Sequence, residues 1–440
     1  MKRKHVFDVH DHGGAGDGKT MDTAAIQRAI DAAAEAGGGA RVLLRAGRTY
    51  LTGPLQLAGN IDFHLEGDAQ LRVSADPADY PNPQQGVLHA MSAHNLTISG
   101  TGAIDGRSRE FMERFDATDE WWIPKKFRPR LLVLEDCENL RIRDVTFTQA
   151  PSWTVHLIGC RHVLIDHVEI RNQLDVPNCD GIDPDHCQDV EIRDCHIACG
   201  DDAIVIKATA GHAQYGATRD IHVHDCVLET QDSGLKVGTE TTQDIHDLLF
   251  ERIKIVTGCR GLCIQLRDEG DVRDVVFRDI EFVSRYHSAP WWGRGEAISF
   301  TAIPRNAATK IGTIRNILVQ NVRGRAENSI RIEALNGARV SDITFDHVDV
   351  TFGRTTSYPG GVYDNRPTKM VREIEPHRTS GISIRHADRV ALKHCTVRWA
   401  PNAPDFFGPA IEAVDAPGLT ITAFVGTAAH PERDEPIVIT

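Results

Sequence analysis

Short alternations of apolar and polar residues recur along most of this chain. Segments such as LRIRDVTF, VLIDHVEI and VVFRDIEF return about every 22 to 31 residues, and each joins two apolar stretches through one polar residue. Alternation with a period of two is typical of β-strands, whose successive side chains point to opposite faces. Strands this short cannot bury a core alone, so each repeat has to stack on its neighbours. The pattern predicts one coil of a solenoid per repeat.

The polar residue between the two apolar stretches forms a column. The column reads Asp144, His167, Asp194, Asp225, Arg252, Asp279, Asn321, His347 and His394. A polar residue at a repeated point is typical of a bend between strands. The next position is apolar throughout and reads Val145, Val168, Cys195, Cys226, Ile253, Ile280, Val322, Val348 and Cys395. We therefore expect the first column at bends and the second in the core, where cysteine acts as a small apolar residue.

A second pattern, x-small-apolar-x-apolar, accompanies the first, for example in DGIDP, DAIVI and SGLKV. We expect its apolar pairs to point inward: Ile182 and Pro184, Ile204 and Ile206, Leu235 and Val237, Leu262 and Ile264, and Ile298 and Phe300. The intervening positions must then point outward. Together the patterns predict an all-β fold, a right-handed parallel β-helix in which each rung pairs with the next.

The ends and interruptions of the repeat predict the domain organisation. Residues 20–36 place Ile26 and Ile30 at helical spacing before three glycines, which predicts an amphipathic helix capping the N-terminal end of the solenoid. We expect a single domain over residues 1–440, with the cap at 1–40. Three stretches predict loop insertions over a cleft: 107–130, 284–296 and 353–380.

Composition and charge limit the classes of partner that we expect. With 440 residues and a net charge of −13, the chain lacks the basic face that nucleic acid needs, so we expect no such partner. No apolar run reaches the length of a membrane span, and no apolar stretch of a signal peptide follows the basic start, so we expect no membrane partner and a cytoplasmic location. In the cytoplasm we expect the 10 cysteines to be free thiols. Association into a homo-oligomer stays open.

Acidic residues crowd one outward position. The residues that lead the second pattern are Trp153, Asp180, Asp202, Ser233, Arg260, Glu296, Asn328 and Ser380. Asp180 and Asp202 lie one rung apart, about 4.8 Å between backbones, and Asp201 precedes Asp202 at the same bend. Like charges this close push carboxyl pKa values apart, so one group can stay protonated beside an ionised one. That division of roles suits cleavage of a glycosidic bond, although a structural aspartate ladder would give the same pattern.

Two motifs at these residues resemble glycoside hydrolase family 28, the polygalacturonase-like enzymes. NCD at 178–180 matches the family's Asn-x-Asp element, and GDD at 200–202 matches its Gly-Asp-Asp element. The opening VFDVHDHGGAGDGKTMDTAAIQRAI is similar to the family's N-terminal segment, so the resemblance covers most of the chain. It implies hydrolysis with inversion and no cofactor, with Asp201 as general acid and Asp180 and Asp202 activating water. Asn178 of the first motif is a candidate for substrate binding.

The chain departs from the family at two further elements. The family's Gly-His-Gly falls on Asp232, Ser233 and Gly234, and its Arg-Ile-Lys falls on Cys263, Ile264 and Gln265. The resemblance implies that the two cations that hold a uronate carboxylate in polygalacturonases are missing here. We therefore expect plain polygalacturonan to be a poor substrate.

Other outward residues are candidates for substrate binding. Ser233 and Gln265 occupy positions that the family uses, and Glu296 is a candidate subsite residue. The replacement cations expected on the exposed face are His156, Lys207, Lys236, Arg260 and Arg331. We expect Asp183 and Asp185 to face solvent or a subsite. His222 and His224 share a strand face, but without an evident third ligand we expect no metal site.

The insertions bring aromatic residues. The pairs Trp121 with Trp122 and Trp291 with Trp292 offer flat rings that can stack on sugars, or that can anchor a loop to the solenoid. Of these, Trp292 is our candidate for sugar binding. The segment GGVYDNRP within 353–380 can close one end of the cleft.

The sequence favours an inverting, exo-acting glycoside hydrolase for pectin-type or other plant-derived oligosaccharides. Two alternatives stay open. A polysaccharide lyase on the same fold would use calcium and a basic residue, and a carbohydrate-binding solenoid would bind sugar without turnover.

Overall fold

The computed structural model describes residues 5–82, 85–335 and 337–440. The chain forms two compact units, residues 1–201 and residues 202–440. The basic residues at 1–4, which entered the prediction of location, lie outside the described residues. The single domain predicted over 1–440 stays a prediction.

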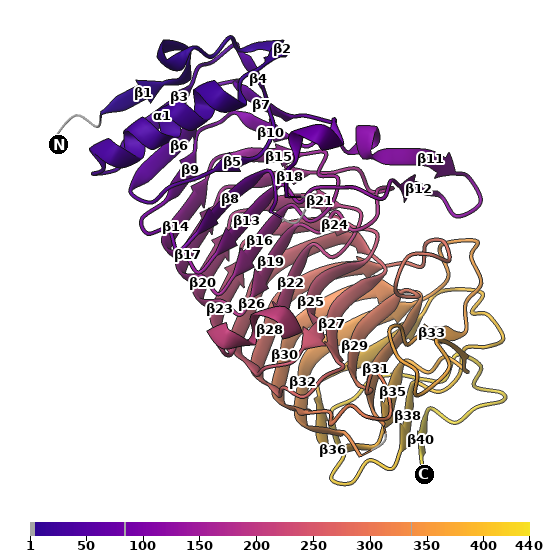
Figure 1. The fold of residues 1–440 in the computed structure, drawn as a ribbon. Coiled ribbons are helices and arrows are strands. Elements are labelled where there is room, and N and C mark those ends of the chain that lie inside the picture. Colours follow the sequence, from indigo (N-terminus) through magenta and orange to yellow (C-terminus); the bar gives the residue numbers. More distant parts are fainter. Residues whose placement is uncertain (1–4, 83–84, 336) are drawn as a thin grey trace. The chain divides into compact units, whose positions relative to one another are not determined.

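Helix α1 (Thr23–Ala36) confirms the predicted N-terminal helix. Ile26 and Ile30 are fully buried on its inner face. The helix packs against the first strands of its unit, including β1 (Val6–Asp8) and β3 (Ala40–Leu44), as the indigo end of Figure 1 shows. The helix therefore covers apolar positions that the first rungs would otherwise expose to water, which is the role of a cap.

Helix α1 begins three residues later than predicted because the preceding residues are extended. Strand β2 (Asp17–Met21) takes up the first two residues of the predicted helix and pairs with a neighbouring strand. The carboxylate of Asp22 accepts the backbone N–H groups of Ala15 and Gly16 at 2.7 and 3.1 Å, which turns the chain into the helix.

Three parallel ladders build the first unit. The first contains β1, β3, β6 (Ile61–Leu65), β9 (Thr97–Ser99), β14 (Glu138–Arg143), β17 (Arg161–Asp166) and β20 (Gln188–Arg193). The second contains β2, β4 (Thr49–Thr52), β7 (Gln70–Val73), β10 (Ala103–Asp105), β15 (Thr146–Thr148), β18 (Glu169–Arg171) and β21 (His196–Cys199). The third contains β5 (Leu55–Gln56), β8 (Leu88–Met91), β13 (Leu132–Glu135), β16 (Val155–Ile158) and β19 (Ile182–Asp185).

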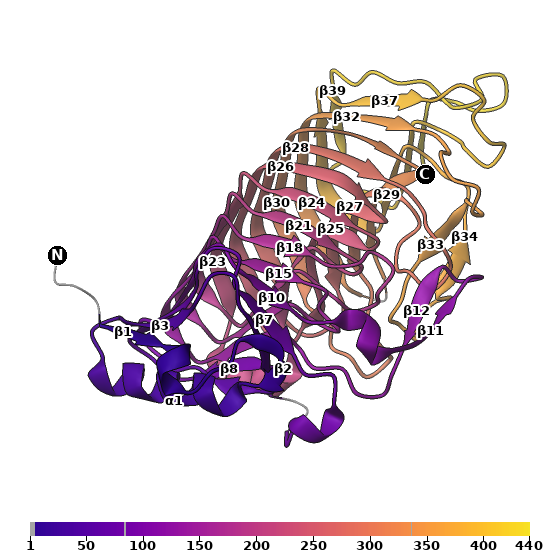
Figure 2. The ribbon, with the colours of Figure 1, turned by 90° about the horizontal axis from the view of Figure 1, so that it is seen from above.

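The second unit repeats this arrangement with longer strands. One parallel ladder contains β22 (Ile204–Ala208), β25 (Ser233–Thr241), β27 (Arg260–Leu266), β29 (Glu296–Ala302), β31 (Asn328–Ala334), β35 (Ile382–Arg385), β38 (Ile411–Val414) and β40 (Ile437–Ile439). The other strands are β23 (Thr218–His224), β24 (Val227–Thr230), β26 (Ile245–Gly258), β28 (Val272–Ser284), β30 (Thr313–Ala326), β32 (Arg339–Phe352), β36 (Ala387–Lys393), β37 (Thr396–Trp399) and β39 (Thr420–Thr422). Figure 2 shows β26 and β28 as successive rungs. The predicted parallel β-helix is confirmed.

The predicted bend column is confirmed by the backbone. Every residue of the column has a positive φ, between 52° and 65°. Asp, Asn and His tolerate this left-handed region better than other side chains, which explains their repetition. Arg252 adopts it too, and its guanidinium donates to both carboxylate oxygens of Asp225 on the preceding rung at 2.9 and 2.8 Å. The apolar residue that follows each bend is buried, as predicted.

The predicted inward pairs form the core. Leu262 and Ile264 of β27 are fully buried, as are the equivalent pairs on the neighbouring strands. In the second unit Phe300 stacks on Phe277 with ring centroids 5.8 Å apart, and Phe277 stacks on Phe250 at 4.9 Å. Phe250 and Phe277 occupy paired positions of β26 and β28, so equivalent residues of these successive rungs stack, as the repeat requires.

The cysteines behave as small core residues. All 10 are buried thiols. The thiols of Cys160 and Cys187, which occupy equivalent points of neighbouring rungs, each donate to a backbone carbonyl, at 3.2 and 3.4 Å. Burial raises the pKa of Cys179 and Cys263, so these thiols stay protonated at neutral pH.

Two of the predicted insertions contain hairpins of their own. In 107–130 the antiparallel strands β11 (Met112–Asp116) and β12 (Trp121–Pro124) pair after a short 3-10 helix, Ser108–Phe111. In 353–380 strand β33 (Val362–Asp364) pairs with β34 (Ile374–Pro376). Further 3-10 helices span Val9–His12, Pro77–Asp79 and Ala210–Tyr215. Among the described residues, no helix is both long and apolar enough to cross a membrane.

Candidate active site

The first group of candidate residues lies in the first unit, at the bends before β19 and after β21. Asp180 is buried and Asp201 is half-buried. Asn178 donates to Asp201 Oδ2 from its backbone N–H at 3.1 Å and from Nδ2 at 3.3 Å. Arg128 Nη2 in turn donates to Asn178 Oδ1 at 2.9 Å. Asn178, predicted to bind substrate, therefore orients Asp201. Arg128 was missed by the sequence analysis, because only the fold brings the end of the 107–130 insertion to Asn178.

The glycine of the GDD motif is required by packing. A Cβ atom at Gly200 would lie 2.1 Å from the carbonyl oxygen of Val176, far inside van der Waals contact. The N–H of Gly200 donates to Cys179 Sγ, in the NCD motif, at 3.1 Å. The two motifs are thus joined through their backbones, and any side chain at position 200 would displace Asp201.

Asp183 and Asp185 do not face solvent, contrary to our prediction. Both carboxylates are fully buried, and so is His156 on the preceding rung. His156 Nε2 lies 3.3 Å from Asp185 Oδ2, and Arg130 Nη1 lies 2.8 Å from His156 Nδ1. Arg130 also covers the ring of Trp153, with Cζ 4.3 Å from the centroid. The end of the 107–130 insertion folds over these strands and excludes water from them.

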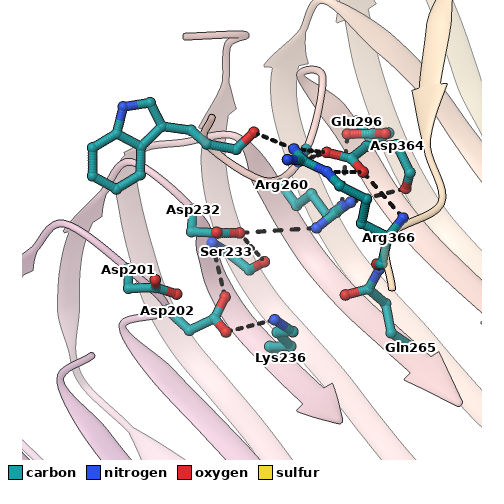
Figure 3. A network of polar contacts seen from close by, with 12 residues as sticks. Asp201, Asp202, Asp232, Ser233, Lys236, Arg260, Gln265, Glu296, Asp364 and Arg366 are labelled. Carbon is teal, nitrogen blue, oxygen red and sulfur yellow. Dashed lines mark hydrogen bonds and ion pairs between the residues drawn. The ribbon is translucent and has the colours of Figure 1, made fainter. Parts of the chain in front are cut away.

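Asp202 begins the second unit and is held by a lysine. Lys236 Nζ lies 2.6 Å from Asp202 Oδ2, and the backbone N–H of Ser233 donates to Asp202 Oδ1 at 3.2 Å (Figure 3). Both charged side chains are almost fully buried. Burial acts to lower the pKa of Lys236, but the charges of Asp202 and Asp232 outweigh it and raise that pKa above its usual range. Ser233 Oγ donates to Asp232 Oδ1 at 3.2 Å. Asp202 and Ser233 thus lie at equivalent points of neighbouring rungs, as predicted, whereas Lys236 is buried instead of lying on an exposed face.

Arg260 and Glu296 lie in a buried network rather than on an exposed face. The Arg260 guanidinium is fully buried, 3.8 Å from Asp232 and 3.8 Å from Glu296. It also donates to the backbone carbonyl of Asp364 at 3.1 Å (Figure 3). Glu296 accepts from the backbone N–H of Arg294 at 2.6 Å. Both residues hold the 353–380 and 284–296 insertions on the sheet, so the predicted exposure of Arg260 is wrong.

Gln265 lies beneath the 353–380 insertion. Its side chain is 1% exposed, and its Nε2 donates to the backbone carbonyl of Arg366 at 3.4 Å. The guanidinium of Arg366 lies nearby, but its Nε and Nη2 already donate to the two carboxylate oxygens of Asp364, at 2.9 and 2.6 Å. Nη2 also donates to the carbonyl of Trp291 at 2.9 Å. Arg366, the cation beside Gln265, is therefore already paired with Asp364.

The tryptophans of the 284–296 insertion take different roles, as the alternatives allowed. Trp291 is buried and anchors the loop, whereas Trp292 is half-buried. The Trp292 ring lies 5.7 Å from Lys236 Nζ and 5.4 Å from Arg366 Cζ. Its remaining exposed area makes Trp292 the better candidate for a sugar platform. In the first unit both tryptophans of 107–130 are half-buried, and Trp122 donates its indole N–H to Asp175 at 3.1 Å.

Lys207 and Arg331 are also buried, against our expectation of exposed cations. Lys207 Nζ lies 3.3 Å from Glu240. Arg331 pairs with Glu333 at 2.6 Å and donates to Asn365 Oδ1 at 2.8 Å, with its Cζ 4.0 Å above the ring of Tyr363. Asn365 and Tyr363, which cover Arg331, come from 353–380, which explains why strand periodicity alone left this cation exposed.

His222 and His224 make ordinary polar contacts. His222 Nε2 lies 3.1 Å from Glu251, and His224 Nδ1 lies 2.6 Å from Asp225. Their rings lie 4.3 Å apart. Each imidazole therefore has a carboxylate as its partner.

Replacing Lys236 with methionine should destabilise the protein. The substitution keeps an apolar stem but leaves the buried Asp202 carboxylate without its ammonium partner, so we expect the free energy of unfolding to fall by about 3–5 kcal/mol. Denaturant titration measures this. Adding Asp202→Asn should restore part of the loss, and Lys254→Met, at an exposed position of β26, should change stability by under about 0.5 kcal/mol. A Lys236→Met protein as stable as the wild type would contradict this account.

Sequence comparison identifies relatives among plant polygalacturonases. A probable polygalacturonase of Vitis vinifera is 29% identical over 303 residues, which cover 63% of this chain and 60% of the relative. An exopolygalacturonase of Zea mays is 23% identical over 384 residues, covering 80% of this chain and 85% of the relative. The chain thus spans 60% of the grape relative's length, and 46% of that of a probable polygalacturonase of Arabidopsis thaliana.

Structural comparison supports the same fold. The crystal structure of a hyperthermoactive exopolygalacturonase from Thermotoga maritima matches with a TM-score of 0.69 and 19% identity, over 90% of this chain and 93% of that one.

The model of glycosyl hydrolases family 28 matches residues 41–363, a range that includes the NCD and GDD motifs and the predicted binding positions up to Arg331. The chain belongs to glycosyl hydrolases family 28.

Proposed function

We propose that the protein is an inverting glycoside hydrolase that acts on pectin-type or other plant-derived oligosaccharides. The observation that carries the proposal is the family match over residues 41–363, which contains all three candidate aspartates. Asp201 is the general acid on the leaving oxygen, and Asp180 and Asp202 activate the attacking water. Inverting enzymes keep their two carboxyl groups about 6.5 to 9.5 Å apart to admit that water.

The surroundings of the aspartates support these roles. Lys236, 2.6 Å from Asp202, is the counter-charge of an ionised carboxylate, which a base must be. Asn178 donates to Asp201 Oδ2 from its backbone N–H and from Nδ2, at 3.1 and 3.3 Å, and so fixes the orientation of this carboxyl group. General acid catalysis requires a carboxyl group held in a fixed orientation toward the leaving oxygen.

The buried cations support a substrate other than plain polygalacturonan. Lys236, Arg260, Arg331 and Arg366 each lie within 4 Å of a protein carboxylate. A cation already neutralised by the protein offers a sugar carboxylate little net attraction. We infer that a neutral sugar, or a differently linked uronide, binds beside Trp292.

Exo-action is part of the proposal. Residues 364–366 are held on the face of the second unit's sheet by three side chains from two rungs: Arg260 and Gln265 of β27, and Arg331 of β31. A glycan chain cannot continue through a position that the polypeptide occupies. This supports cleavage near a chain end. The predicted cytoplasmic location, which would favour small oligosaccharides, stays a prediction.

Hydrolysis should invert the configuration at the anomeric centre. Direct attack of water opposite the leaving group gives inversion, whereas a covalent glycosyl-enzyme intermediate gives retention. One-dimensional NMR of the first product, recorded before mutarotation, distinguishes them. A first product with the substrate's own configuration would contradict the roles assigned to the three aspartates.

A panel of defined oligosaccharides, with products followed by NMR, tests the proposal as a whole. It reports the bond cleaved, the anomer formed and the exo or endo mode together. Products with an unsaturated ring and new near-ultraviolet absorbance, lost on adding chelator, would replace the hydrolase with a lyase. Binding without turnover would replace it with a carbohydrate-binding solenoid.

A further inference from the structure

Two insertions of the second unit, 284–296 and 353–380, contact each other as one body, and we call them the paired insertions. Asp364 Oδ2 accepts the backbone N–H of Gly293 at 3.1 Å and lies 3.1 Å from Arg294 Nη1. Arg366 donates to the carbonyl of Trp291 at 2.9 Å. The rings of Tyr286 and Tyr358 meet edge to face at 5.4 Å. Segments more than 60 residues apart in the sequence thus form one covering layer.

The buried carboxylate of Glu327 joins this layer to the solenoid and contacts both insertions. Glu327 lies between β30 and β31 and is 2% exposed. From the first insertion it accepts the backbone N–H of Tyr286 at 3.0 Å. From the second it accepts the backbone N–H and hydroxyl of Thr355, both at 2.6 Å, and those of Thr356, at 2.7 and 2.8 Å. Arg354 Nη1 lies 2.8 Å from the same group.

This set of donors requires an ionised carboxylate. Each carboxylate oxygen has two lone pairs, and every group that faces Glu327 is a donor or a cation. Burial acts to raise the pKa of Glu327, but Thr355, Arg354 and the N–H of Tyr286 outweigh it and lower the pKa below its usual range. A glutamine would turn an NH₂ group toward backbone N–H groups or the Arg354 guanidinium, none of which can accept a hydrogen bond from it.

The layer that Glu327 holds carries the candidate sugar contacts. Trp292, with Lys236 and Arg366 on either side of its ring, belongs to it, and so do residues 364–366 that close the sheet face. Figure 3 shows Asp364 and Arg366 lying over Arg260 and Gln265. The hydrogen bonds of Glu327 run to both paired insertions, so we expect Glu327 to act on the substrate through this layer.

We propose that Glu327 is a positioning residue for substrate affinity: it fixes both paired insertions, and thereby Trp292 and residues 364–366, in the sugar-binding arrangement before substrate arrives. The expected effect on substrate affinity rests on the proposed function, whereas the anchoring of the insertions rests on the contacts of Glu327. A loop ordered in advance loses less conformational entropy on binding, so binding is tighter.

The variant Glu327→Gln tests the proposal in two independent ways. On the best oligosaccharide of the panel we expect KM to rise about 10- to 100-fold, the effect of losing one or two charge-assisted hydrogen bonds, while kcat stays within about threefold. Hydrogen exchange should become faster in both 284–296 and 353–380. The exchange measurement requires no turnover, so it tests the anchoring even if the proposed hydrolase activity fails.

Glu251→Gln is the matched control. Glu251 is a buried carboxylate of β26, 4% exposed, that accepts from Arg278 Nε at 2.6 Å and pairs with His222 at 3.1 Å. Losing it should lower stability without raising KM or changing exchange in the paired insertions. This separates anchoring of the insertions from a general loss of stability.

The double variant Thr355→Val/Thr356→Val removes two hydroxyl donors from the opposite side and covers the case in which Glu327→Gln does not fold. It should raise KM in the same direction, and its effect should not add to that of Glu327→Gln, because both break one cluster. Unchanged KM and unchanged exchange in either folded variant would overturn the proposal. A rise in KM equal to that of Glu251→Gln would overturn it too.

Discussion

We expect Asp201→Asn to lower turnover at least about 100-fold and to leave the unfolding transition close to that of the wild type. General acid catalysis typically contributes 10²- to 10⁴-fold, and an amide cannot supply the proton that the leaving oxygen needs. Asparagine has nearly the same shape and can still accept from the N–H groups of Asn178, at 3.1 and 3.3 Å in the wild type. Initial rates on the best oligosaccharide of the panel measure the effect, with denaturant titration to confirm folding. Retained activity would remove Asp201 from the mechanism.

Asp201→Asn is a cleaner experiment than the neighbouring substitution. Asp202→Asn is also expected to abolish most activity, but it leaves the buried Lys236 without its partner at 2.6 Å, so lost activity and lost stability would be mixed. Combining Asp180→Asn with Asp202→Asn should cost little more than either alone, because both serve one water. Strict additivity would mean that the two aspartates do not act together.

We expect plain polygalacturonan to be hydrolysed two to four orders of magnitude less efficiently than the best substrate of the panel. Family polygalacturonases place cations where this chain has Cys263 and Gln265, so a bound carboxylate loses two charge-assisted hydrogen bonds of roughly 1.5–3 kcal/mol each. At about 1.4 kcal/mol per factor of ten, that deficit gives the stated range. Values of kcat/KM across the panel measure it.

The structure strengthens this expectation. Both positions are buried, and Gln265 donates to the carbonyl of Arg366, so a carboxylate at this point would have to displace the 353–380 insertion. We expected Lys236 to recover part of the deficit, but it is paired with Asp202. Comparable rates on polygalacturonan and on the best panel substrate would refute the prediction. So would a sugar-bound structure with a carboxylate held beside Gln265.

The solenoid could be predicted from the sequence because its determinants are local and repeat. A left-handed residue is needed at every bend, and Asp, Asn and His tolerate that conformation, so the bend column from Asp144 to His394 was visible in the letters alone. The inward pairs follow from the period of two. Helix α1 was predicted to within three residues, and its start was missed because Asp22 binds backbone N–H groups before the helix instead of extending it.

The candidate aspartates were found because two short motifs occur in register with the repeat. The groups that hold them were harder to find. Arg128 reaches Asn178 across 50 residues of sequence, and Glu327 reaches Tyr286 across 41 and Thr355 across 28. Nothing in the repeat marks these residues, since each serves an insertion rather than a rung.

The exposure of the outward side chains was decided by the tertiary structure alone. Strand periodicity placed five side chains on the outer face of the rungs: His156, Lys207, Lys236, Arg260 and Arg331. They do point outward, but the prediction that solvent reaches them is wrong, because all five are buried. Alternation says which way a side chain points, not what lies above it. The segment that covers Arg260 comes from 104 residues further along the chain, at Asp364. The sequence by itself determined the rungs, their bends and the acidic motifs, since these depend on near neighbours. Only the folded chain decided which cations are paired and which face is closed, since insertions pack wherever the completed solenoid offers them partners.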